Sequence, residues 1–327
     1  MTVSRPPTMP FGWFRIGYSD EFPAEQIRPL HYFGRELVAW RPQGSKPRLA
    51  DAFCPHMGAH LGYGGTVVGD HIACPFHKWE FGADGFCARV PYNARGYDRA
   101  RLRMYPVCEQ DGMVWAWYHE DETAPPQWEV PVIDGWADRW VVGEVRYLRP
   151  TKCLWYDAGE NLVDMAHRPV VHGVTDADDV KFEEDGHRLR LLWRLTYDAT
   201  RIGQGVIEDT VSLEVIGPGM TIMRHNAVVP LIAVCGPTPI DDQSFDLRMT
   251  YAMPVKDPDS RQKLFARMFV RYLLQELEHD AAVWDHKAYL DRPCLLPEDG
   301  PIMQLRRWAT QFRCQAPAAR EPALVLP

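Results

Sequence analysis

The sequence predicts an α+β protein of two domains, a small all-β domain followed by an antiparallel sheet crossed by one long helix. Three observations support this prediction. Short strand-like segments separated by Gly and Pro fill residues 12–120. Strand-like alternation with turn signals then runs from His187 to Met253. A capping signal around Asp259 opens a helical pattern that reaches about Lys287. With 327 residues the chain is long enough for two hydrophobic cores.

In the first domain we expect strands at Leu37–Trp40, Thr66–Ile72 and Met113–Tyr118. Residues 121–130 contain Thr123-Ala124-Pro125-Pro126 and are expected to form a linker. The first domain is therefore placed at residues 1–125.

The second domain is placed at residues 126–315. It is expected to begin with a strand from about Trp140 to Tyr147, followed by a helix over about 154–167. Turns between the later antiparallel strands are predicted at Gly203, Gly217-Pro218-Gly219 and Asp241-Asp242. Residues 316–327, rich in Pro and Ala, are expected to form a flexible tail.

Two short Cys/His motifs carry the first chemical signal. Cys54-Pro55-His56 and Cys74-Pro75-Phe76-His77 each offer one thiolate and one imidazole. Four such ligands can hold a tetrahedral zinc, or can be buried side chains without a metal. A zinc finger, however, usually keeps its two Cys on one arm and its two His on the other. One Cys and one His on each arm favour a [2Fe–2S] cluster with two Cys on one iron and two His on the other.

The residues around these motifs fit that interpretation. Glycines crowd the first arm and allow backbone N–H groups to turn toward cluster sulfurs. Trp79 and Phe81 follow the second arm and are expected to shield the cluster from water. Because neutral imidazoles replace two thiolates, the His-ligated iron is the easier one to reduce, and the cluster accepts electrons at a raised potential.

A second metal site is predicted in residues 160–173. Glu160, Asp164 and His167 fall on one face of a helix, with Asn161 beside them. Pro169 should break that helix and let His172 turn back toward His167. A surface helix with a solvated polar stripe is the alternative. The apolar remainder of the helix, and the need of the upstream cluster for an electron acceptor, favour a mononuclear metal.

A third ligand is needed to complete a 2-His-1-carboxylate triad. The candidates in the long helix are Glu276, Glu278, Asp280 and Asp285. Asp280 is chosen because it lies within an apolar stripe, where a carboxylate requires a partner. The spacing alone separates it only weakly from its neighbours. The stripe consists of Phe269, Leu273, Leu277, Asp280 and Trp284.

At this point the chain resembles the Rieske non-haem iron oxygenases over nearly its whole length. The resemblance rests on CPHMGAHLGYGG, CPFHKWEF and the E-N-x-x-D-x-x-H-x-x-x-x-H pattern at 160–172. The chain is most similar to the steroid-acting branch, which includes 3-ketosteroid 9α-hydroxylases and cholesterol 7-desaturases. The resemblance implies an N-terminal all-β Rieske [2Fe–2S] domain and a C-terminal helix-grip catalytic domain that binds mononuclear Fe(II).

The resemblance also implies roles for single residues. Cys54, His56, Cys74 and His77 are the expected cluster ligands, in agreement with the motif spacing. His167, His172 and Asp280 are the expected iron ligands. Asp164 is the expected bridge that carries electrons from the cluster of a neighbouring subunit. Asn161, beside it on the helix, is a further candidate catalytic residue.

The function implied is that of the oxygenase component of a monooxygenase. It would hydroxylate a hydrophobic, polycyclic, steroid-like substrate with O2 and with electrons from an NADH-dependent reductase, directly or through a ferredoxin, as a head-to-tail homotrimer. A second hypothesis is a Rieske oxygenase that catalyses desaturation, demethylation or aromatic hydroxylation. A third hypothesis is a non-catalytic electron carrier. Departures from the family pattern leave the substrate and the carbon attacked open: Lys78 in place of the usual Gly, Arg168-Pro169 between the iron His residues, and a shorter chain.

The pocket wall is expected to include residues of the sheet, with core packing as the alternative for each. The candidates are Val206, Val211, Met220, Met223 and Val228.

Composition excludes several other partners. A net charge of −8 argues against nucleic acid and against an anionic membrane surface. No run of 18 apolar residues appears, and the N-terminal segment has no signal-peptide pattern. Apart from Cys54 and Cys74, the other six cysteines have no disulfide framework spacing, and free thiols beside an oxygen-sensitive cluster predict a reducing, cytoplasmic location.

Overall fold

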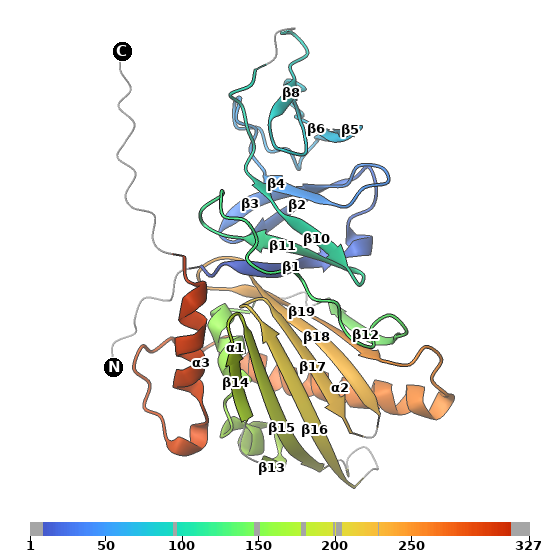
Figure 1. The fold of residues 1–327 in the computed structure, drawn as a ribbon, viewed down its shortest axis with the longest axis vertical. Helices are drawn as coiled ribbons and strands as arrows, with labels where there is room; N and C mark the ends of the chain where they lie inside the picture. Colours follow the sequence, from blue (N-terminus) through green and yellow to red (C-terminus); the bar gives the residue numbers. More distant parts are fainter. Residues whose placement is uncertain are drawn as a thin grey trace.

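The computed structural model describes residues 9–93, 97–146, 151–177, 181–198, 200, 205–227 and 229–314. Figure 1 shows two lobes along the long axis of the molecule, an N-terminal lobe of strands and a C-terminal antiparallel sheet crossed by a long helix. The predicted α+β class is therefore confirmed. The predicted tail at 316–327 lies outside the described residues.

The first lobe consists of short strands that pair in three sheets among the described residues. The first sheet has the order β1-β11-β10, the second β2-β3-β4-β9, and the third β5-β6-β7-β8. A 3-10 turn, Ser19–Glu21, follows β1. The strands are β1 (Gly12–Tyr18), β2 (Ile27–Tyr32), β3 (Arg35–Trp40), β4 (Arg48–Asp51), β5 (Thr66–Val68), β6 (His71–Ala73), β7 (Glu80–Phe81), β8 (Cys87–Arg89), β9 (Met104–Tyr105), β10 (Val107–Gln110) and β11 (Met113–Tyr118).

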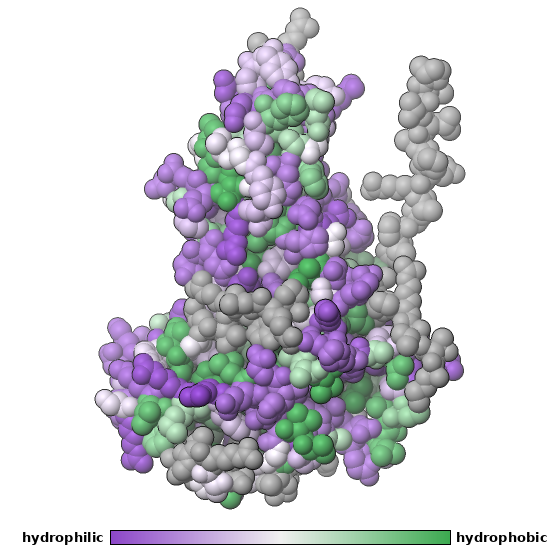
Figure 2. All heavy atoms as spheres, turned by 180° about the vertical axis from the view of Figure 1, so that it is seen from behind, coloured by the Kyte–Doolittle hydropathy of each residue, from purple (hydrophilic) through white to green (hydrophobic). Residues whose placement is uncertain are grey.

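Two of the three predicted strands of this lobe are confirmed, as part of β3 and as β11. The third prediction, one strand over Thr66–Ile72, is wrong. Gly69 has a φ of +57°, which starts a tight turn, and Val68 pairs with His71 in a hairpin of β5 and β6. The narrow end of the lobe also exposes large apolar side chains, and Figure 2 shows hydrophobic residues reaching its surface among polar ones.

The second lobe is an eight-stranded antiparallel sheet of order β12-β19-β18-β17-β16-β15-β13, with β14 also paired to β15. The predicted turns at Gly217-Pro218-Gly219 and Asp241-Asp242 are confirmed. The predicted turn at Gly203 lies outside the described residues. The strands are β12 (Trp140–Arg146), β13 (Val174–Ala177), β14 (Lys181–Asp185), β15 (Arg188–Asp198), β16 (Val206–Ile216), β17 (Met220–Asn226), β18 (Pro230–Pro239) and β19 (Phe245–Met253).

The long helix α2 (Ser260–Trp284) begins where its capping signal predicts. Asp259 accepts a hydrogen bond from Gln262 N at 2.8 Å, and Gln262 Oε1 accepts one from Asp259 N at 2.9 Å. The helix ends three residues before the predicted Lys287. A further helix, α3 (Ile302–Ala309), was not predicted because its pattern is only eight residues long. Two 3-10 turns flank it, Pro297–Asp299 and Thr310–Phe312.

The helix predicted over 154–167 is shorter in the structure. Helix α1 (Trp155–Asn161) ends at Asn161, and a π-helix, Arg168–His172, follows after a turn. Met165 N donates to Asp299 O at 3.1 Å, so a contact with the loop before α3 replaces the helical hydrogen bond. Tertiary contact therefore overrides the helical pattern of the sequence.

The two lobes meet through a buried polar contact. Arg15 on β1 is fully buried and donates from Nη1 to Thr250 Oγ1 at 3.2 Å and from Nη2 to Val234 O at 3.4 Å. Thr238 Oγ1 donates to Arg15 O at 2.7 Å. Gly219, in the turn before β17, lies directly under β1, where a Cβ atom would be 2.3 Å from Trp13 O. The first lobe is thus seated on the sheet that carries the second metal site.

The substitution Gly219→Ala should lower the free energy of unfolding by about 1–3 kcal/mol, because its Cβ has no space against Trp13 O. Gly143→Ala on β12 is the matched control, since its Cβ would meet Val270 Cγ1 at an ordinary 3.9 Å. Differential scanning calorimetry measures both. Equal melting temperatures for the two variants would contradict the proposed close packing between the lobes.

Candidate metal centres

The two Cys/His loops at the end of the first lobe have the same type of backbone turn. Cys54 O accepts a hydrogen bond from Gly58 N at 2.9 Å, and Cys74 O accepts one from Lys78 N at 3.1 Å. Gly58 has a φ of +73° and Lys78 a φ of +59°. Each loop therefore folds back four residues after its Cys, and Lys78 adopts the left-handed backbone conformation that favours glycine.

The turns bring the four expected cluster ligands together. Cys54 and Cys74 are both buried, and their thiols are within hydrogen-bonding reach of each other. The rings of His56 and His77 lie 4.7 Å apart. Trp79 stacks on His56 with ring centroids 4.4 Å apart and nearly parallel planes.

The environment of these side chains fits a bound cluster. Burial raises the pKa of the Cys54 thiol to about 12, so a thiolate there requires positive charge beside it, which iron supplies. Nδ1 of His77 is buried and has no hydrogen-bond partner in the described part of the chain. A metal ligated by this nitrogen would satisfy it.

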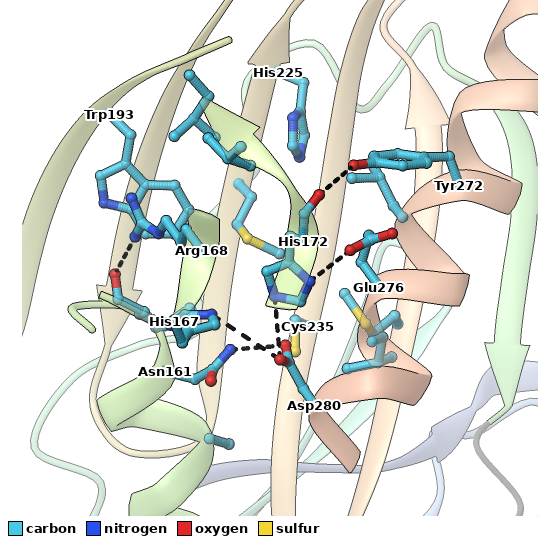
Figure 3. A pocket seen from close by; sticks show the side chains of 18 of the residues that line it. Asn161, His167, Arg168, His172, Trp193, His225, Cys235, Tyr272, Glu276 and Asp280 are labelled. Atoms are coloured by element: carbon cyan, nitrogen blue, oxygen red, sulfur yellow. Dashed lines mark hydrogen bonds and ion pairs between the residues drawn. The ribbon is translucent and has the colours of Figure 1, made fainter. Parts of the chain in front are cut away.

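The second group of ligands lies under the large sheet. His167 precedes the π-helix, His172 is its last residue, and Asp280 is on α2. One donor atom from each lies within 4.8 Å of the other two. Asp280 Oδ1 is 3.1 Å from His172 Nε2 and 4.0 Å from His167 Nε2. Figure 3 shows both imidazoles directed at this carboxylate, so three donors of a facial triad face one another.

The local backbone explains why both imidazoles converge. His172 is five positions after His167, at the end of the π-helix, and the wider turn returns His172 to the side of His167. Pro169 lies in the first turn, where its missing N–H costs no hydrogen bond. Gly173, with a φ of +67°, ends the segment, and its N–H donates to Arg168 O. The predicted return of His172 is thus confirmed, although the break in α1 comes earlier than Pro169.

Neighbouring side chains fix two of the three donors. Asn161 Nδ2 donates to Asp280 Oδ2 at 2.9 Å, which leaves Oδ1 facing the imidazoles. Glu276 Oε2 is 2.5 Å from His172 Nδ1, and Tyr272 Oη donates to His172 O at 3.3 Å. A carboxylate that accepts from the outer nitrogen of a His fixes its tautomer and directs the other nitrogen inward.

The charge of this site is suited to a cation. Although burial alone lowers the pKa of His172, the carboxylates of Asp280 and Glu276 raise it above its usual value. The same negative charge attracts a metal ion, and the donor set of two imidazoles and one carboxylate oxygen fits ferrous iron. In solution, therefore, protons and metal compete for His172.

One sequence expectation for a nearby acid is wrong, and a second acid has a contact that the sequence left open. Glu160 was expected on the face of Asp164 and His167, but α1 ends before that spacing applies. Its Oε1 instead lies 2.6 Å from Arg306 Nε, and its Oε2 lies 3.1 Å from Lys287 Nζ. Glu276, considered only as a possible ligand, contacts the outer side of His172. Its position four residues before Asp280, on the same helix face, was the signal for that contact.

A cavity of about 180 Å³ opens beside the triad, and its wall is mainly apolar. Of the expected wall residues, Met223 lines it. Val211 and Met220 belong to the core, Val206 is exposed, and Val228 lies outside the described residues. The other apolar residues of the wall are Ala158, Leu162, Val174, Trp193, Leu195, Cys235, Leu247, Met249, Tyr251, Tyr272, Leu273, Leu277 and Trp284.

Comparison with known families identifies both lobes. Residues 12–106 match the Rieske [2Fe-2S] domain, and residues 116–313 match the 3-ketosteroid 9α-hydroxylase C-terminal domain. The chain is a Rieske oxygenase of the 3-ketosteroid 9α-hydroxylase family. It is therefore an oxidoreductase that uses a [2Fe–2S] cluster and a mononuclear non-haem iron. The predicted family, enzyme class, fold and cofactors are confirmed.

Individual relatives cover almost the whole of this Rieske oxygenase. The oxygenase component of 3-ketosteroid-9-alpha-monooxygenase from Rhodococcus rhodochrous is 31% identical, over 94% of this chain and 81% of the relative. Cholesterol 7-desaturase from Xenopus laevis is 29% identical, over 94% of this chain and 72% of the relative.

Solved structures share the fold at lower identity. Dicamba monooxygenase bound to 3,6-dichlorosalicylic acid has a TM-score of 0.74 at 18% identity, covering 92% of this chain and 96% of that one. Dicamba monooxygenase with non-heme iron and dicamba has a TM-score of 0.67 at 16% identity, covering 95% and 98%. Within the described residues of the Rieske oxygenase, no helix has both the length and the hydrophobicity to cross a bilayer.

The left-handed backbone at Lys78 makes a prediction about stability. Lys78→Gly should raise the free energy of unfolding by about 0.5–1 kcal/mol, because glycine adopts this φ without strain. Gly58→Ala in the other loop is the matched reverse substitution and should lower it, since a Cβ there meets no atom and only the φ of +73° opposes it. Thermal unfolding of the cluster-loaded protein measures both. Shifts of the same sign would contradict the strain argument.

Proposed function

We propose that this Rieske oxygenase is the oxygenase component of a monooxygenase that hydroxylates a hydrophobic, polycyclic, steroid-like substrate. O2 and electrons from NADH are the other reactants, and a reductase delivers the electrons, directly or through a ferredoxin. The observation that carries the proposal is the apolar cavity that opens on His167, His172 and Asp280. A small set of polar groups at one place in an apolar cavity is typical of a site for an apolar substrate.

In this proposal His167, His172 and Asp280 hold the mononuclear iron. When bound, the iron supplies the activation of O2 that no side chain provides. Three protein ligands are the set that would leave the iron accessible to O2. Asn161 and Glu276 act as positioning residues, because they hold Asp280 and His172 by hydrogen bonds at 2.9 Å and 2.5 Å. The apolar wall excludes water from the reacting carbon.

The cluster in this proposal is held by Cys54, His56, Cys74 and His77. Strands β5 to β8, next to its loops, lie at one end of the long axis, and the large sheet and α2, which carries Asp280, lie toward the other, with two sheets of the first lobe between them (Figure 1). This arrangement favours electron transfer from the cluster of one subunit to the iron of another. A head-to-tail homotrimer provides such a contact.

Asp164 is the proposed bridge at that contact. Its side chain is one-third exposed, and its Oδ1 accepts from His167 N at 3.2 Å and lies 3.5 Å from His167 Nδ1. Although burial raises the pKa of Asp164, hydrogen bonds from His167 lower it below its usual value, so the carboxylate is ionised. An ionised acceptor at the surface can receive a hydrogen bond from a cluster imidazole of the next subunit.

The end of the first lobe has the surface that such contacts require. Large apolar side chains are exposed around the cluster loops, and exposed apolar groups of this kind mark protein-protein contacts. They include Phe53, Met57, Tyr63, Phe76 and Tyr92. The eight cysteines are free, which supports the proposed reducing, cytoplasmic location.

Desaturation is the second candidate reaction. The cholesterol 7-desaturase relative is nearly as similar as the 9α-monooxygenase relative, at 29% against 31% identity. Both outcomes begin at one iron centre and differ in the fate of the substrate.

Product analysis separates these reactions. Protein reconstituted with iron and cluster, a ferredoxin reductase and NADH would be incubated under ¹⁸O₂ with a panel of sterols and one substituted benzoate. Mass spectrometry should show a sterol product with one added ¹⁸O atom. A sterol that has lost two hydrogens would establish the desaturase instead. Consumption of NADH and O2 with the benzoate alone would contradict the steroid-like substrate.

Asp164→Asn should lower turnover about 100-fold or more, because the bridging carboxylate loses its charge next to His167. Both metal centres should remain bound. Stopped-flow reoxidation of the pre-reduced cluster would locate the defect at electron transfer. Asp242→Asn, in the exposed turn between β18 and β19, is the control and should keep normal rates. Normal coupled turnover by Asp164→Asn would rule out the bridge.

A further inference from the structure

The cavity contains a polar group that the metal centre does not use. His225 on β17 lines the cavity and is only 7% exposed. Its Nδ1 lies 2.8 Å from Oδ2 of Asp209 on β16, which is also buried. Oδ1 of Asp209 accepts a hydrogen bond from Asn226 N at 2.8 Å. The carboxylate is therefore fully engaged, and it holds the imidazole from behind.

This contact determines what the other ring nitrogen offers. A carboxylate accepts a hydrogen bond from Nδ1–H, so the neutral imidazole keeps its lone pair on Nε2. Asp209 contacts Nδ1 of His225, which leaves Nε2 as the ring nitrogen for a ligand. Phe269 packs against the ring at 5.4 Å and at 89°, which fixes its plane. In Figure 3 the imidazole of His225 points into the cavity that the metal donors also face.

In Figure 3 His225 lies apart from His167 and Asp280, on the side of the cavity nearer Tyr272. Its ring contacts Phe269, and the iron-site carboxylate is that of Asp280, eleven residues later on α2. At 1.5 Å per residue, these two positions are about 16 Å apart along the helix axis. A rigid ligand with one end at the metal donors can therefore extend toward His225 with the other end.

Arg168 is another polar residue of the cavity wall, but the protein already engages its side chain. Its guanidinium stacks on the Trp193 ring at 3.8 Å, and its Nη2 donates to Leu162 O at 3.0 Å. His225 thus offers an acceptor nitrogen in a wall that is mainly apolar. A buried acceptor facing an apolar ligand would lose its hydrogen bonds to water, so the complementary ligand has a donor there.

We infer that His225, held by Asp209, is the anchor for an alcohol hydroxyl at the end of the substrate farthest from the carbon that reacts. The hydroxyl donates to Nε2. This inference rests on the proposed function for the class of the substrate and specifies one functional group of it. A keto oxygen at the same position is an acceptor only, and it meets the lone pair of Nε2 unfavourably. The site therefore selects hydroxysterols over ketosteroids.

The test measures binding to the full-length protein loaded with cluster and iron, under anaerobic conditions so that no turnover occurs. Three forms of one sterol skeleton serve as probes, with a 3-hydroxyl, a 3-keto group or no oxygen at carbon 3. Quenching of protein fluorescence reports binding, since Trp193 and Trp284 line the cavity. The wild type should bind the hydroxyl form about tenfold more tightly than either of the others.

Two variants separate recognition from a structural role of the buried pair. His225→Phe should bring the three dissociation constants within about twofold of one another, with the value for the oxygen-free sterol little changed. His225→Gln offers an amide oxygen that can accept from a hydroxyl and should restore part of the preference. A purely structural role would weaken all three sterols alike and would lower the melting temperature. Cluster absorbance and iron content verify that each variant is folded.

The outcomes are distinct. Equal affinity of the wild type for all three sterols overturns the inference and leaves the steroid-like substrate in place. A hydroxyl preference that survives in His225→Phe also overturns it. If the wild type binds none of the three, the proposed substrate class fails and the inference fails with it. If His225→Phe does not fold, the other two proteins provide the test. A hydroxyl preference in the wild type that is reduced in His225→Gln supports the inference, and an unreduced preference in His225→Gln overturns it.

Discussion

The catalytic lobe depends on the contacts of the Asp280 carboxylate, whose two oxygens face different partners. Oδ2 accepts from Asn161 on α1, and Oδ1 faces His172 and His167. A buried carboxylate on an apolar helix stripe is unfavourable unless such partners are present. The contact joins α1, the π-helix and α2, three segments distant in the chain, and it positions one oxygen for a metal. A shift of α2 along its axis would move Asp280 away from Asn161 and from both imidazoles at once.

The rest of the fold holds these segments in place. Behind α1, Glu160 contacts Arg306 on α3 and Lys287 beyond the end of α2, so a buried ion network sets the position of Asn161. In front, the large sheet forms the wall of the cavity. The first lobe sits on the far side of that sheet through Arg15, which places the cluster loops at the other end of the molecule. The two candidate metal centres therefore lie in separate lobes of the chain, and this separation is the reason for proposing electron transfer between neighbouring copies.

Much of this was predictable from the sequence, and the failures have physical causes. Cys54, His56, Cys74 and His77 were found because short loops fix ligand spacing locally. The capping box at Asp259 located the start of α2 for the same reason. The end of α1 and the π-helix were missed because they depend on a long-range contact, Met165 N to Asp299 O, that no local pattern encodes. Glu160 was misassigned as a consequence. The anchoring role of Glu276 depends on which way His172 turns, which only the folded chain determines.

The central claim is that one chain carries a mixed His/Cys diiron cluster and a separate mononuclear iron. Metal analysis of anaerobically purified and reconstituted protein, with EPR of the reduced sample, tests it most directly. The account predicts about three irons per chain and the low-g-value signal of a cluster with mixed His and Cys ligands. Two irons per chain would remove the oxygenase site, and zinc without that signal would contradict the whole account.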